Sequence, residues 1–209
     1  MTARHTAVAL LGAALFTTLL VLVLTAWEPL RAVDLTTLNG LHSYALDHHG
    51  YTATMKAIST AGSAPVYVVL FTVITAWLLY QRRWREASFV AVAEIGGGLL
   101  NDLLKFIVHR PRPVVTDPVA HADGLGFPSG HAQSAAVAAT VLLVVVATEF
   151  NRTAQVYSYG LAGLAVALIG FSRVALSVHY VSDVLAGYCA GITWAFYVLL
   201  VMNRVWLDR

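Results

Sequence analysis

Three separated stretches carry polar residues that could do chemistry in an otherwise apolar chain. They read KFIVHRPRP (105–113), PSGH (128–131) and SRVALSVHYVSD (172–183). Among their residues, three cations, a serine hydroxyl, a glycine, two histidines and a carboxylate are the candidates for a site. Such groups bind phosphate oxygens and transfer protons. Phosphate binding and histidine-based catalysis are therefore the first two hypotheses for these stretches.

The positively charged residues predict a phosphate pocket. Lys105, Arg112 and Arg173 are cations, and an arginine can hold two phosphate oxygens at once. Ser129 adds a hydroxyl group, and Gly130 would let the backbone approach a ligand at the amino end of the next helix, where unpaired N–H groups favour anions. Each cation alone could simply reach toward the lipid headgroups. Their combination with two histidines favours a binding site.

The histidines and one carboxylate predict a nucleophile and an acid. His179 and Asp183 are four residues apart, so on a helix they would share one face, with the carboxylate accepting a hydrogen bond from one imidazole nitrogen. The other nitrogen would then be free to attack. His131 could protonate the leaving oxygen. These roles favour phosphoryl transfer through a phosphohistidine, which water activated by His131 would hydrolyse.

The elements that must position these residues are membrane helices. The chain has 209 residues, of which 58% are hydrophobic and 11% charged. A soluble domain is about one quarter charged, so the composition places the chain in a bilayer. The net charge of +2 and the lack of a basic cluster argue against a nucleic-acid partner. The single cysteine, Cys189, cannot form an internal disulfide.

Six apolar stretches approach the length of roughly 20 residues that a helix needs to cross a bilayer. They run approximately Ala7–Trp27, Ala64–Tyr80, Ala87–His109, His131–Phe150, Ala154–Phe171 and Val184–Met202. The first is long for a secretory signal core, so we interpret it as a membrane helix. The sequence therefore predicts an all-α, polytopic membrane protein with six transmembrane helices in a single domain, 1–209.

The distribution of Lys and Arg predicts the orientation, because short cytoplasmic loops carry the excess of positive charge. If the six helices alternate, one side holds Arg4, Arg82, Arg83, Arg85, Arg152, Arg204 and Arg209. The other side holds Arg31, Lys56, Lys105, Arg110, Arg112 and Arg173. Three of the latter are already assigned to the phosphate pocket. We therefore expect both termini in the cytoplasm and the three polar stretches at the outer face of the cytoplasmic membrane.

Other polar residues receive weaker interpretations. Leucines and a valine recur at helical spacing within 28–63, which predicts an interfacial helix covering the site. A polar cluster in the same segment is interpreted as solvated loop residues and not as a metal site. It comprises His42, Asp47, His48 and His49. Asp102, three residues before Lys105, could either orient that lysine or be a buried, satisfied acid.

The three stretches resemble the signature of the type-2 phosphatidic-acid phosphatase (PAP2) family of membrane lipid phosphatases. That signature is Lys, six residues, Arg-Pro; then Pro-Ser-Gly-His; then Ser-Arg, five residues, His, three residues, Asp, and the chain matches it in order and spacing. The resemblance implies a six-helix fold, a helical core like that of vanadium-dependent haloperoxidases, and hydrolysis without a metal or cofactor. It implies His179 as nucleophile, Asp183 as its partner and His131 as acid. It implies phosphate binding by Lys105, Arg112, Ser129, Gly130 and Arg173.

The leading hypothesis is thus a membrane phosphatase acting on a lipid phosphate, such as undecaprenyl diphosphate, phosphatidylglycerol phosphate or phosphatidic acid. The alternative is a transporter or flippase that binds a phosphorylated lipid without cleaving it. Such a binder has no need for a nucleophile and an acid. A vanadate-dependent oxidant would use a similar pocket, but six membrane spans argue against it. The motifs recognise only the phosphate, so they predict neither the lipid tail nor the oligomeric state.

Overall fold

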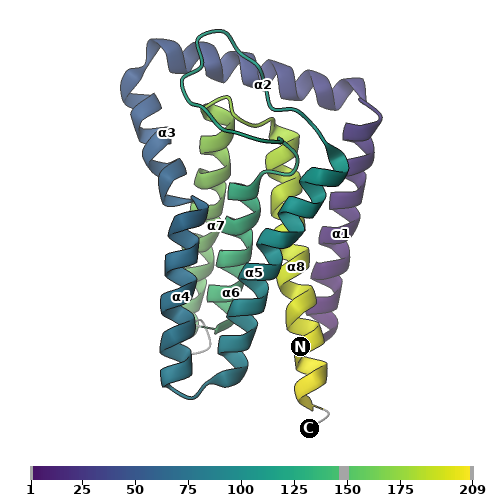
Figure 1. The fold of residues 1–209 in the computed structure, drawn as a ribbon, viewed down its shortest axis with the longest axis vertical. Helices are drawn as coiled ribbons and strands as arrows, with labels where there is room; N and C mark the ends of the chain where they lie inside the picture. Colours follow the sequence, from purple (N-terminus) through teal and green to yellow (C-terminus); the bar gives the residue numbers. More distant parts are fainter. Residues whose placement is uncertain (1, 146–150, 208–209) are drawn as a thin grey trace.

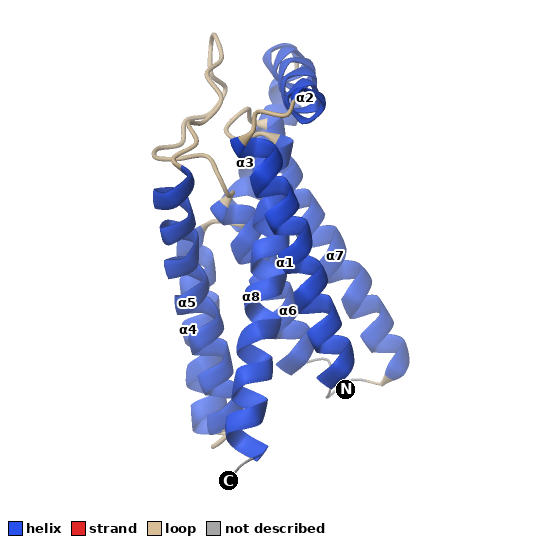
Figure 2. Cartoon of the chain, turned by 90° about the vertical axis from the view of Figure 1, so that its right-hand side faces the viewer, coloured by secondary structure: helices blue, strands red, loops and turns tan. Residues whose placement is uncertain are grey.

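Eight α-helices and no strand form the part of the chain that the structure, a computed structural model, describes: residues 2–145 and 151–207 (Figures 1 and 2). In chain order they are α1 (Thr2–Leu24), α2 (Glu28–Asp47), α3 (His49–Ala61), α4 (Ala64–Tyr80), α5 (Trp84–Val108), α6 (Gly130–Val145), α7 (Arg152–Ala175) and α8 (Val181–Leu207). All but α2 run along the length of the bundle in Figure 1. The predicted all-α class is confirmed.

Five stretches of helix are long and apolar enough to cross a membrane. They are Ala3–Leu24, His49–Tyr80, Trp84–Val108, Arg152–Ala175 and Val181–Asn203. The remaining predicted span corresponds to α6, which is apolar but has only 16 described residues. Its expected continuation to Phe150 lies outside the described residues. The structure thus shows five full-length candidate spans and one shorter apolar helix where six spans were expected.

The second span begins earlier than predicted. It was expected at Ala64, but α3 leads into α4 through residues 62–63, so the continuous apolar stretch starts at His49. At this junction a Cβ on Gly62 would lie 2.5 Å from the side chain of Ile169 in α7. Glycine therefore permits the close approach. As a result only α2 lies across the end of the bundle, and α3 descends beside α7 (Figure 1).

Close backbone contact between α6 and α8 places the start of α6. A Cβ on Gly187 would lie 2.6 Å from the carbonyl oxygen of Ser129, and one on Gly191 would lie 2.5 Å from that of Gln133. Small residues let membrane helices approach to this degree. The buried Gln133 side chain accepts a hydrogen bond from Asn101 (2.9 Å) and donates one to the carbonyl oxygen of Gly97 (2.7 Å). These bonds tie α6 to α5 and satisfy the polar groups that they bury.

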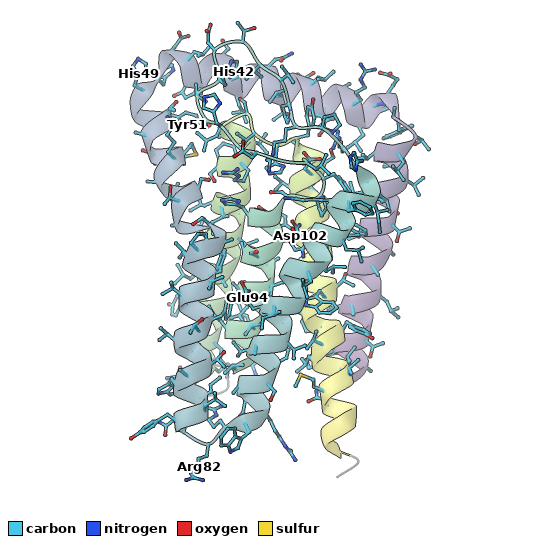
Figure 3. All side chains as sticks on the ribbon, in the orientation of Figure 1. His42, His49, Tyr51, Arg82, Glu94 and Asp102 are labelled. Atoms are coloured by element: carbon cyan, nitrogen blue, oxygen red, sulfur yellow. The ribbon has the colours of Figure 1, made fainter. Side chains whose placement is uncertain are left out.

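The two ends of the bundle differ. The helix α1 begins, and α8 ends, at the end opposite α2 (Figures 1 and 2). Arg82, in the turn between α4 and α5, lies at this same end, whereas His42 lies at the α2 end (Figure 3). The three polar stretches all meet at the α2 end, on α5, α6, α7 and the segments that link them.

Candidate active site

The first polar stretch leaves α5 and crosses the α2 end of the bundle. The helix ends at His109, which adopts a left-handed conformation (φ 53°), and two prolines follow that cannot continue it. The chain returns at Gly126, whose N–H donates to the carbonyl oxygen of Arg110 (2.8 Å). A Cβ on Gly126 would lie 3.3 Å from Oδ2 of Asp183. The glycine thus lets this loop pass close to a carboxylate of the third stretch.

A pocket of about 1040 Å³ opens at this end of the molecule. Its lining includes six of the predicted site residues: Lys105, Arg112, Gly130, His131, Arg173 and His179. The other two, Ser129 and Asp183, are fully buried beside it. Ser129 donates its backbone N–H to the carbonyl oxygen of Asp183 (2.9 Å), which joins the second stretch to the third. All eight predicted residues therefore converge from three separate segments.

His179 does not lie on a helix. It was expected to share a helix face with Asp183, but α8 starts only at Val181, and His179 belongs to the non-helical link 176–180. Asp183 lies in the first turn of α8, where its Oδ2 accepts the N–H of Tyr180 (3.0 Å). Unpaired N–H groups at a helix start attract such a carboxylate. The pair meets because Asp183 caps this turn and the link bends back over it.

The imidazole of His179 is held between an acid and a guanidinium. Its Nδ1 lies 3.4 Å from Oδ2 of Asp183, at ion-pair distance but without the geometry of a good hydrogen bond. Its Nε2 lies 2.8 Å from Nη1 of Arg112. A guanidinium can only donate, so Nε2 must carry a lone pair and Nδ1 the proton. This is the tautomer that a nucleophilic Nε2 requires.

The protonation state of His179 agrees with this assignment. The side chain is 1% exposed, and burial lowers its pKa to about 4, although the nearby carboxylate of Asp183 acts to raise it. A neutral imidazole at pH 7 keeps the lone pair available. The nucleophile expected from the sequence is thus unprotonated at Nε2 in the resting structure.

Besides Nδ1 of His179, two buried donors beside the pocket have no hydrogen-bond partner. They are the hydroxyl of Ser129 and Nε of Arg173. Arg173 is buried in the last turn of α7, and its Nη1 donates to the hydroxyl of Ser59 on α3. Most buried polar groups in proteins are paired, so each exception calls for an explanation. A phosphate oxygen bound at this place would accept hydrogen bonds from both donors.

The cover of the pocket differs from the prediction. Residues 118–123 of the loop line the pocket, whereas no residue of α2 does. His42 on α2 holds this loop: its Nε2 lies 2.7 Å from the carbonyl oxygen of Thr116, and its Nδ1 lies 3.2 Å from the hydroxyl of Ser177. His42 was interpreted as a solvated loop residue. That interpretation was wrong, because the polar cluster lies on α2 and α3 and at their junction.

The interpretation of Asp102 as a buried acid was wrong. The residue lines the pocket and is exposed, so it is not a buried acid, and the described residues show no ion pair between it and Lys105. Figure 3 places it on the upper part of α5, above Glu94.

The sequence did not predict two charged residues that contact the third polar stretch without lining the pocket. Arg110 was counted only as a loop charge and Asp34 was not considered, yet both contact the third polar stretch. A signal for Asp34 was present: it is an acid between Val33 and Leu35 in an apolar-patterned segment, and such residues are usually functional. Nothing local to either residue indicated its partner.

Comparisons with known proteins identify one family. The model of the PAP2 superfamily matches residues 86–207. Phosphatidylglycerophosphatase B of Bacillus subtilis is 32% identical over 146 residues, which cover 69% of this chain and 71% of that protein. Undecaprenyl-diphosphatase BcrC of Bacillus subtilis is 25% identical over 165 residues, which cover 73% of this chain and 77% of that protein.

A solved structure shows the same fold. The crystal structure of the first transmembrane PAP2 type phosphatidylglycerolphosphate phosphatase from Bacillus subtilis matches with a TM-score of 0.76 and 27% identity, covering 93% of this chain and 96% of that one.

Proposed function

The chain belongs to the PAP2 superfamily of membrane lipid phosphatases, and from that premise we propose that it releases phosphate from a membrane lipid through a phosphohistidine at His179. One observation carries the proposal: a histidine with its Nε2 lone pair at the pocket, a second histidine and three cations all line one cavity. A protein that only binds phosphorylated lipids would need the cations but neither histidine. We therefore favour hydrolysis over transport.

In the first step, Nε2 of His179 attacks phosphorus while the bond to the leaving oxygen breaks. His131, in the first turn of α6, donates a proton to that oxygen. Lys105, Arg112 and Arg173 neutralise the charge on the equatorial oxygens, which is the main demand of phosphoryl transfer. Arg112 exchanges its contact with Nε2 for phosphate oxygens as the substrate enters.

In the second step, water hydrolyses the phosphohistidine. His131, now unprotonated, takes a proton from the water, whose oxygen attacks phosphorus. The P–N bond breaks, His179 regains its lone pair and orthophosphate leaves. Three cations supply the charge compensation, so the proposed cycle requires no metal or cofactor.

For the substrate we place phosphatidylglycerol phosphate first, because that lipid appears in the names of both a relative and a matching structure. Undecaprenyl diphosphate comes next, since a second relative is named for it. Phosphatidic acid offers the same terminal phosphate. A panel of the three lipids in detergent, with phosphate release measured at matched concentrations, would rank them.

We propose that the pocket faces the outer side of the cytoplasmic membrane. The supporting observation is that Arg82, the start of α1 and the end of α8 all lie at the end of the bundle opposite α2 (Figures 1 and 3). Short basic segments favour the cytoplasm. In a Cys189→Ala background, an Arg82→Cys variant should react with an impermeant thiol reagent only after the cells are opened. Labelling in intact cells would reverse the orientation.

The central test is phosphate release by purified protein in the presence of a chelator. The wild-type chain should be active, and a His179→Ala variant should lose activity by several orders of magnitude. A His49→Gln variant, altered at an exposed histidine at the start of α3, serves as control and should remain active. Full activity in His179→Ala would refute the mechanism. Lipid binding without phosphate release by the wild-type chain would favour the transporter.

A further inference from the structure

Asp183 is held by Arg110, which lies within the first polar stretch at a position that the signature does not specify. Its Oδ2 faces the nucleophile side, accepting the N–H of Tyr180 and lying 3.4 Å from Nδ1 of His179. Its Oδ1 is 2.5 Å from Nη1 of Arg110. Arg110 does not line the pocket, so its side chain would act on the reaction indirectly, through Asp183. The guanidinium also lies over the ring of Tyr180, 4.5 Å from its centroid, which fixes its plane.

A second buried carboxylate holds Arg110 in turn. Asp34 of α2 is 1% exposed, and its Oδ2 accepts from Nη2 of Arg110 (2.9 Å). Oδ1 of Asp34 accepts the N–H of Ser182 (2.9 Å), and Oδ2 also accepts the hydroxyl of Ser182 (2.5 Å). The same hydroxyl accepts from Nη1 of Arg110 (2.7 Å). No fully buried side-chain polar atom of these four residues is left unpaired, and α2 is tied directly to the first turn of α8.

The charges make this group more than a packing contact. Asp34 and Asp183 are both buried, and Arg110 is the cation that contacts both. A buried carboxylate without a counterion is strongly disfavoured, whereas a hydrogen-bonded pair is tolerated. Arg110 therefore supplies the counterion for the Asp183 carboxylate and leaves Oδ2 of Asp183 facing the imidazole. The carboxylate can then stabilise the positive charge that develops on His179 as Nε2 bonds to phosphorus.

We propose that Arg110 and Asp34 are positioning residues for the nucleophile, acting through Asp183. The inference rests on the proposed function, since it assigns a task only if His179 attacks phosphorus. It gives α2 a role that the sequence did not suggest: the helix supports the nucleophile from behind while the loop covers the pocket. The competing view is that the group merely fastens α2 to the bundle.

Kinetics separate the two views. An Arg110→Met variant keeps an unbranched apolar stem and removes the charged guanidinium. We expect kcat to fall by about 10- to 100-fold, the usual effect of losing a partner that orients a reacting group. KM and inhibition by orthophosphate should stay within about 2-fold, because the cations that bind phosphate are unchanged. Inhibition by vanadate should weaken, because a five-coordinate vanadate depends on its bond to the nucleophile as the transition state does.

Two further variants and one control complete the test. Arg110→Lys keeps the positive charge but lacks the planar guanidinium, so it should show a higher kcat than Arg110→Met. Asp34→Asn should also lower kcat, but by less than Arg110→Met. Both also serve if Arg110→Met fails to fold. Arg31→Met removes another arginine near this group, one whose partner Glu28 is exposed, and should behave as wild type.

Wild-type kcat in Arg110→Met and Asp34→Asn, or a loss confined to KM or to thermal stability, would overturn the inference. If His179→Ala is inactive in the same assay, that result contradicts the inference but not the proposed function. Activity in His179→Ala would instead remove the proposed function itself.

Discussion

Nη1 of Arg112 lies 2.8 Å from Nε2 of His179, so the group expected to bind phosphate also covers the lone pair expected to attack it. The guanidinium is anchored by three carbonyl oxygens: Nε donates to those of Asp123 and Gly124, and Nη1 to that of Val178. Phosphate oxygens are stronger acceptors for a guanidinium than an imidazole is. Substrate binding would thus release the nucleophile at the place where the phosphorus arrives.

Replacing Arg112 with lysine should be costly. An Arg112→Lys variant keeps the charge but loses the planar fork that reaches both the loop carbonyls and the phosphate. We expect kcat/KM for lipid phosphate to fall by about 100-fold, or about 2.7 kcal/mol of transition-state stabilisation. Steady-state phosphate release measures it. A Lys56→Arg variant, altered at a lysine of α3 that also lines the pocket, is the matched reverse exchange and should change kcat/KM little. A tolerated Arg112→Lys would contradict the role in phosphate binding.

The two tasks of His131 can be separated by choice of leaving group. A nitrophenolate leaves without an acid, so with p-nitrophenyl phosphate a His131→Gln variant should still form the phosphohistidine but hydrolyse it slowly. We expect a burst of nitrophenolate equal to the enzyme concentration, and acid-labile phosphate on the protein. Rapid-mixing absorbance and labelled phosphate measure the two. His121→Gln, at an exposed histidine of the same pocket, is the control and should show no burst. A His131→Gln variant without a phosphoenzyme would contradict the assignment.

The contact between α6 and α8 should be sensitive to a single methyl group. In Gly187→Ala the new Cβ would lie 2.6 Å from the carbonyl oxygen of Ser129 and 3.0 Å from Cβ of Ala132. The start of α6 must move, so we expect a loss of about 1–3 kcal/mol in the free energy of unfolding, with reduced activity. Gly163→Ala on α7 meets nothing within 4 Å and should retain both. Thermal unfolding and phosphate release report the two effects. Equal behaviour of the two variants would refute the packing argument.

Stability should depend on pH through His179. Its pKa is lowered by burial from the ordinary 6.5 to about 4. Between those values the unfolded chain binds a proton that the folded protein does not, so stability falls as the pH falls through this window. Above pH 6.5 the residue contributes no slope. A His179→Gln variant lacks the group and should lose less stability between pH 6.5 and 4. Thermal unfolding in detergent at intermediate pH values tests this, and parallel curves for the two proteins would exclude it.

The helical class and the chemistry of the site could be read from local patterns. Apolar length identifies membrane helices because a bilayer demands it of each segment separately. The three polar stretches stood out for the same reason, since charged residues next to apolar segments are costly. The prediction failed where neighbours decide the outcome. The helix α3 joins α4 because Gly62 fits against Ile169, a residue 107 positions away in the sequence.

Local sequence patterns were thus enough to identify the residue types of the site: a nucleophile, an acid, a carboxylate and the cations of a phosphate pocket, all in or next to helix ends. The contacts between these residues depend on how the helices pack. His179 lies in a link instead of on a helix, and Arg112 contacts its Nε2. Asp34 contacts Ser182, which is 148 residues away in the sequence, and Arg110 contacts Asp183. Such contacts depend on how closely the helices pack, and that closeness depends on glycines and side chains that are distant in the sequence.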